Sequence, residues 1–201
     1  MDKAAIFIDG RYTLQVQSEV HPDIIEPQHL ADAPPGDWVS EHLPKGAKLG
    51  FDPWLHTQQS AKTFRVAVEK AGGELVAVSD NPIDAIWENQ PAAPIASVVP
   101  HPMEYAGKSS VDKRRDIGAA LQKDGLDAAV LTAPDSVAWL LNIRGGDVSH
   151  TPLPLSYAIA HASGSVDLFI DPRKLAPEVG AHLGNGVSVA APDAFPAALE
   201  A

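Results

Sequence analysis

A five-residue sequence close to the N-terminus returns once in this chain with a single difference. Residues 7–11 read FIDGR, and residues 169–173 read FIDPR, 162 positions later. Both copies end an apolar run that is typical of a buried strand, and both precede a segment with helical features. Residues 24–27 have a looser echo in residues 187–192 at a similar offset. Such a repeat predicts two tandem units of the same α/β fold.

Short apolar runs alternate along the chain with segments of helical periodicity, and 15 glycines and 18 prolines separate them. Ser163 and Gly164 stand between the last two predicted strands, which indicates an antiparallel hairpin and hence a mixed sheet. Trp139 falls among apolar residues of a predicted helix, and we expect it in the core. The predicted strands are 4–8, 23–26, 48–51, 74–78, 127–131, 155–161 and 166–170, and the predicted helices are 12–20, 37–43, 57–71, 109–125 and 135–143.

Proline-rich sequence between residues 82 and 107 interrupts this alternation, because proline can neither continue a helix nor pair fully in a sheet. We therefore predict a first domain at 1–95, a linker at 96–108 and a second domain at 109–201. Only eight residues precede Asp9, whereas a long stretch of the second unit precedes Asp171. From this difference we expect both domains to be truncated.

Charge and composition exclude several classes of function. The chain has 15 basic and 26 acidic residues, for a net charge of −11, which disfavours nucleic-acid partners and anionic membrane surfaces. It contains no cysteine, so disulfides, thiolate metal sites and thiol nucleophiles are excluded. No apolar run is long enough to span a bilayer. We expect a cytoplasmic protein without membrane or nucleic-acid partners.

Four segments, in order, resemble landmarks of the Xaa-Pro aminopeptidases, the aminopeptidase P branch of the creatinase and prolidase family. They are residues 7–15 with the DGRY sequence, residues 50–53, residues 81–87 and residues 136–148. The resemblance covers nearly the whole chain. It implies two tandem creatinase N-terminal-like domains, of ribonuclease H-like fold, with mixed sheets flanked by helices.

The same resemblance implies that the catalytic domain is absent from this sequence. Three-domain members of the branch place two creatinase-like domains before a metal-binding pita-bread domain, which uses two divalent metals, usually Mn²⁺, to cleave the bond before a penultimate proline. The chain also has no HExxH sequence and no paired histidines at helical spacing. We expect no catalytic and no metal-binding residue here, and an inactive fragment when it is alone.

Arg11 is the candidate substrate-binding residue. The resemblance implies that an arginine in the DGRY sequence contacts the peptide substrate, and a guanidinium suits a carboxylate or carbonyl acceptor. The alternative is that Arg11 only pairs with a neighbouring carboxylate, as its counterpart Arg173 would. Arg144, Asp147 and His150 lie in a turn-rich loop and are candidates for an interdomain or cleft-lining role, with a solvated loop as the alternative.

The leading hypothesis is therefore the non-catalytic front portion of an Xaa-Pro aminopeptidase. It would shape access for proline-containing peptides, contact its own catalytic domain and mediate a homodimer. A stand-alone peptidase-like interaction scaffold is the second hypothesis, although incomplete sheets would leave unpaired edges in it. A small-molecule-binding α/β domain is the third, and the sequence offers no evident site for one.

Overall fold

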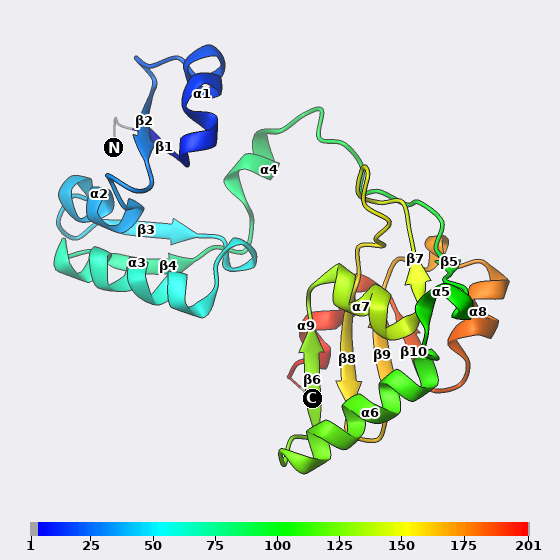
Figure 1. Ribbon diagram of the computed structural model, residues 1–201. Coiled ribbons are helices and arrows are strands. Elements are labelled where there is room, and N and C mark those ends of the chain that lie inside the picture. The colour runs from blue at the N-terminus through cyan, green and yellow to red at the C-terminus, as the bar shows by residue number, and fades with distance from the viewer. Residues whose placement is uncertain (1–3, 201) are drawn as a thin grey trace. The chain divides into compact units, whose positions relative to one another are not determined.

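The computed structural model describes residues 4–200, and the chain divides into two compact units, Met1–Pro91 and Ala92–Ala201 (Figure 1). The proposed linker at 96–108 differs from this division, because that segment packs onto the second unit. Val98 is buried, and its N–H donates to the carbonyl of Lys174 at 2.9 Å. The segment also contains a short strand and a helical turn, β5 and α5. Isolated backbone hydrogen bonds and one buried apolar side chain hold it despite its prolines.

The first unit contains two separate parallel strand pairs, β1 with β2 and β3 with β4. Its second strand continues through Pro27, where the sequence predicted an end. Among the described residues β2 pairs only with β1, and an edge strand tolerates proline because its outer edge needs no donor. The elements of this unit are β1 Ala4–Ile8, α1 Thr13–Glu19, β2 Ile25–His29, α2 Pro35–His42, β3 Lys48–Phe51, α3 Gln58–Lys70, β4 Glu74–Ala77 and α4 Pro82–Ile86.

The core of the first unit lies between α2 and α3, where Val39, Leu43 and Val68 are buried together. The predicted start of α3 is confirmed, since the Thr57 hydroxyl accepts a hydrogen bond from the N–H of Ser60 at 3.1 Å. This cap satisfies one of the backbone donors that a helix start leaves unpaired.

The second unit is built on a four-stranded sheet in the order β10-β9-β8-β6. β6 and β9 both run antiparallel to β8, and β10 runs parallel to β9, so the predicted mixed sheet and hairpin are confirmed. Its elements are β5 Val99–Pro100, α5 Met103–Ala106, α6 Ser110–Lys123, β6 Ala128–Leu131, α7 Pro134–Leu141, β7 Ile143–Arg144, β8 Tyr157–His161, β9 Val166–Phe169, α8 Pro177–Leu183, β10 Val187–Ala190 and α9 Phe195–Ala198.

Both faces of this sheet are covered. The helices α6 and α7 lie across one face, over the buried side chains of Val166 and Leu168 (Figure 1). On the opposite face Phe195 of α9 stacks on Tyr157 with ring centroids 4.7 Å apart and contacts Phe169. Successive side chains of β8 and β9 point to opposite faces of the sheet, so each strand contributes buried residues to both faces.

Trp139 is not in the core, contrary to the sequence-based expectation. Its side chain is 51% exposed, whereas its neighbours Ala138 and Leu140 are each 1% exposed. An α-helix turns 100° per residue, so α7 cannot bury every residue of an apolar run against one sheet. The indole instead lies over the ammonium of Lys113, with Nζ 4.6 Å from the ring centroid.

The internal repeat is visible in the strand register. Ala4 of β1 pairs with Ile25 of β2, and Val166 of β9 pairs with Val187 of β10, so the partners are separated by the same number of residues in both copies. The two strands differ at the edge that faces away from β2 or β10. β9 also pairs with β8, whereas β1 has no second strand partner within residues 4–200. Ala4 is accordingly exposed, while Val166 is only 1% exposed.

Candidate functional site

Arg11 follows β1 in a tight turn in which Asp9 holds its guanidinium. The Asp9 carboxylate accepts from the backbone N–H of Arg11 at 2.8 Å, and it binds Nε and Nη2 of the same side chain at 3.1 and 2.6 Å. The Arg11 side chain is 83% exposed, and Nη1 makes no hydrogen bond within residues 4–200. One edge of the guanidinium is therefore fixed, and the other can receive a planar acceptor such as a carboxylate or a peptide carbonyl.

Electrostatics reinforce this arrangement. Hydrogen bonds from the Arg11 side chain and backbone lower the pKa of Asp9 and so favour its ionised form. The same pair raises the pKa of Arg11. Since both groups are exposed, the pair orients the guanidinium more than it stabilises the fold.

The second copy of the motif repeats this geometry. Asp171 accepts from the backbone N–H of Arg173 at 2.9 Å, and from Nε and Nη2 at 3.0 and 2.5 Å. The hydrogen bonds from Arg173 lower the pKa of Asp171 to about 2. The Asp–Arg pair is thus a shared local structure in both units, and it agrees with the structural alternative that the sequence left open.

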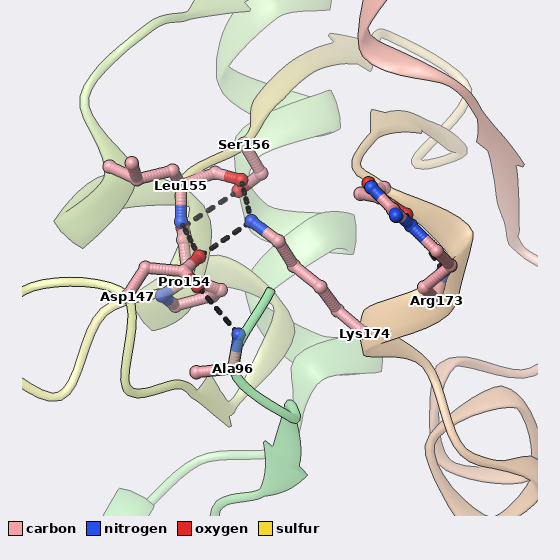
Figure 2. A network of polar contacts seen from close by, with 8 residues as sticks. Ala96, Asp147, Pro154, Leu155, Ser156, Arg173 and Lys174 are labelled. Carbon is pink, nitrogen blue, oxygen red and sulfur yellow. Dashed lines mark hydrogen bonds and ion pairs between the residues drawn. The ribbon is translucent and has the colours of Figure 1, made fainter. Parts of the chain in front are cut away.

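Asp147 is an internal anchor of the second unit (Figure 2). Its side chain is 0% exposed and binds the ammonium of Lys174 at 2.6 Å. The carboxylate also accepts from the N–H groups of Ala96 and Leu155 at 3.1 and 2.7 Å. Figure 2 shows Lys174 pointing toward this network and its neighbour Arg173 pointing away from it. Asp147 therefore joins the segments at Ala96, Leu155 and Lys174, and its side chain is closed off from solvent.

The three loop candidates do not converge on one site. Arg144 is partly buried, and its Nη1 donates to the carbonyls of Ala138 and Ile143 at 3.3 and 2.8 Å. His150 is exposed in a turn with a φ of 58°. Sequence reasoning missed Lys174, the buried partner of Asp147. The only sequence feature that could have pointed to Lys174 is its position directly after the FIDPR sequence at 169–173.

The described residues do not form a metal centre. Within residues 4–200 no group of three or more histidine, aspartate or glutamate side chains is placed to hold a metal ion. The donor set of the described residues thus does not fit a dinuclear metal centre. In the same part of the chain no helix is both long and apolar enough to cross a membrane.

Comparison with known proteins decides the family. The model of the creatinase/prolidase N-terminal domain matches residues 89–201, which is more than half of the chain. This chain belongs to the creatinase/prolidase N-terminal domain family. The match covers the whole second unit, including the mixed sheet and the Asp147–Lys174 pair.

Curated relatives are similar to this chain over both units. A probable Xaa-Pro aminopeptidase P of Paracoccidioides brasiliensis (strain Pb03) is 36% identical over 192 residues, covering 94% of this chain and 31% of the relative. One from Leptosphaeria maculans is 35% identical over 190 residues, covering the same shares of the two chains. The chain thus spans about a third of the length of the curated relatives it matches.

A solved structure agrees with these matches. The crystal structure of an X-prolyl aminopeptidase from Caenorhabditis elegans, described as a cytosolic enzyme with a di-nuclear active site, has a TM-score of 0.89 and 28% sequence identity. The similarity covers 98% of this chain and 33% of that chain. The resemblance inferred from the DGRY sequence and the other landmarks is confirmed.

Proposed function

We propose that this creatinase/prolidase family chain is the non-catalytic portion of an Xaa-Pro aminopeptidase, an enzyme that removes the N-terminal residue preceding proline. The observation that carries the proposal is the similarity to Xaa-Pro aminopeptidase P over 94% of the chain, joined to a family-model match over the second unit. Both units would be creatinase-like domains, since β1–β2 and β9–β10 share one register.

Arg11 is the residue that we propose to contact the peptide. Asp9 fixes its Nε–Nη2 edge, which lowers the conformational entropy lost when the other edge receives an acceptor. A peptide carbonyl or a C-terminal carboxylate has the required acceptor geometry. In this reaction the loop residues Arg144 and His150 would shape access to the site.

In the proposed enzyme, the metal ions are bound outside this chain. Two divalent ions, with Mn²⁺ as the expected metal, would be held by residues outside this chain, because the described residues offer no ligand cluster. The solved relative is described as having a di-nuclear active site, which agrees with this expectation. We further propose that the assembled enzyme is a cytoplasmic homodimer to which these units contribute contacts.

The test is steady-state kinetics of the complete enzyme that contains this segment, using an Xaa-Pro peptide. Arg11→Ala should lower kcat/KM by about tenfold or more, because one charge-assisted hydrogen bond is lost. Arg11→Lys should recover little of the lost kcat/KM, since an ammonium cannot reproduce the planar pair of N–H donors of a guanidinium. Metal content should be unchanged in both variants.

Arg173→Ala is the matched control, since Asp171 holds Arg173 in the geometry seen at Arg11. It should leave kcat/KM at the wild-type value. Wild-type kinetics for Arg11→Ala would remove the substrate contact. A complete enzyme with no Xaa-Pro activity would remove the proposed function as a whole.

A further inference from the structure

Lys113 of α6 is buried without an acidic partner. It is 4% exposed, and its ammonium donates to the carbonyl of Trp139 at 2.9 Å and to Oδ1 of Asn142 at 2.6 Å. No carboxylate lies within salt-bridge distance of it in residues 4–200. Lysine is seldom buried unless its charge is paired, so the neutral oxygens and the Trp139 ring leave a net positive charge at this place.

Asn142 brings the guanidinium of Arg144 and the imidazole of His101 to the same place. It ends α7 with a φ of 50°, and its carbonyl accepts from the N–H of His101 at 2.7 Å. The adjacent β5–β7 pairing sets Arg144 opposite Val99, two residues before His101. Arg144, His101 and Lys113 therefore surround one helix end, and within the described residues neither Arg144 nor His101 forms a salt bridge.

The charges at this helix end do not cancel. Arg144 and Lys113 donate to the last carbonyls of α7, whose dipole supplies only about half a negative charge against two full positive ones. The pKa values of the neighbouring groups are shifted accordingly. Burial lowers the pKa of His101, and the charges of Arg144 and Lys113 lower it further. Burial, Arg144 and Lys108 together lower the pKa of Lys113.

The acidic residues of α6 are paired with other basic side chains. Lys108 is paired with Asp116, and Arg115 is paired with Asp112 at 2.7 Å, so the acidic residues of α6 are already engaged. Glu104 of α5 forms no ion pair within residues 4–200. Arg144 and Lys113 therefore carry positive charge that no carboxylate of the described residues pairs, in a chain whose net charge is −11.

We propose that Arg144 and His101 form a binding site for a carboxylate carried by an acidic peptide segment. Arg144 would supply the guanidinium fork, His101 a ring N–H, and buried Lys113 the supporting positive charge. Exposed apolar side chains border the site, with Met103 at 54%, Tyr105 at 72% and Trp139 at 51% exposure, which suits a protein segment with apolar residues beside its acidic one. The site lies in the second unit and does not depend on the proposed aminopeptidase activity.

The test is an NMR titration of the 201-residue chain with an acetylated, amidated hexapeptide that alternates glutamate and leucine. A matched peptide with glutamine in place of glutamate is the control. About 0.15 M salt screens the long-range repulsion from the acidic remainder of the chain, while a direct contact survives. We expect the glutamate peptide to shift the imidazole signals of His101 and to raise its pKa, and the glutamine peptide to do neither.

Arg144→Gln should weaken the affinity about tenfold or more. Arg173→Gln is its control, because Asp171 already neutralises that arginine, and it should leave the affinity unchanged. His101→Gln gives a second probe if Arg144→Gln does not fold, and it should also weaken binding. No shift of His101, equal binding of both peptides, or binding of inorganic phosphate without the glutamate peptide would each overturn the proposal.

Discussion

Lys174 donates to the carboxylate of Asp147 at 2.6 Å, with 5% and 0% of the two side chains exposed. Residues 96, 147 and 174 come from three distant parts of the sequence, and this pair holds them together inside the second unit. A buried ion pair of this kind contributes mainly by satisfying each partner's charge, so removal of one partner leaves the other unpaired.

Removing one member of this pair should therefore destabilise the second unit strongly. Asp147→Ala is expected to lower the free energy of unfolding by about 3–5 kcal/mol, because Lys174 is left buried and charged. Urea denaturation measures the change. Hydrogen exchange should quicken at the amides of Ala96 and Leu155, which lose their acceptor.

The pair of Lys48 and Glu74 provides the control, since its atoms are 3.4 Å apart and both side chains are mostly exposed. Lys48→Ala should change stability little. An Asp147→Ala variant as stable as Lys48→Ala would contradict the anchoring role of Asp147.

Asp171 should make stability depend on pH in the acidic range. Hydrogen bonds from Arg173 lower its pKa from 3.8 to about 2 in the folded chain. A carboxylate with a depressed folded pKa contributes stability that is present above its ordinary pKa and is lost as the pH falls through the folded pKa. The loss should fall between pH 3.8 and about 2.

Arg173→Gln should remove most of this dependence, because it removes the side-chain donors to Asp171. NMR titration of the Asp171 carboxyl carbon measures the pKa directly in both forms. An unchanged pKa of Asp171 in the variant would show that Arg173 is not its cause.

Two helical glycines should respond oppositely to alanine. At Gly118 of α6 a Cβ would lie 2.8 Å from the carbonyl oxygen of Ala162, which is backbone of the β8–β9 turn. Gly118→Ala should therefore destabilise the chain, since backbone cannot move aside easily. At Gly180 of α8 nothing lies within 4 Å of the added atom. Gly180→Ala should stabilise by up to about 1 kcal/mol through helix propensity.

Thermal denaturation of the two variants gives the comparison. Equal and favourable shifts would mean that α6 does not pack closely on the turn at Ala162. A destabilised Gly180→Ala would mean that α8 is not helical at that position.

Hydrogen exchange should distinguish the two copies of the repeated strand. β9 lies between β8 and β10, whereas β1 pairs only with β2 within the described residues. Amides of β9 should exchange far more slowly than those of β1, because unpaired edge groups meet water directly. Similar protection in both strands would show that β1 has a second partner in solution.

The sequence predicted the parts of the fold that depend on local pattern. The cap at Thr57, the hairpin turn at Gly164 and the repeated Asp–Arg motifs each follow from residues close together in the chain. Register is similarly constrained, since a slip of one residue would turn the buried side chains of β9 outward.

Long-range pairing could not be predicted in this way. Asp147 looks like a polar loop residue, and only the fold brings Lys174 and the N–H of Ala96 to it. Trp139 was misplaced because an apolar run does not show which side of a helix faces the sheet. Arg144 was selected for its loop position, whereas its neighbours Lys113 and His101 come from elements that pattern alone did not join to it.

The measurement that tests the central claim most directly is the intact mass and peptidase activity of the protein purified from its native source. The account predicts a species several tens of kilodaltons heavier than 21.2 kDa that cleaves an Xaa-Pro peptide and loses this activity with a metal chelator. A species of 21.2 kDa that lacks Xaa-Pro activity with added Mn²⁺ would contradict it.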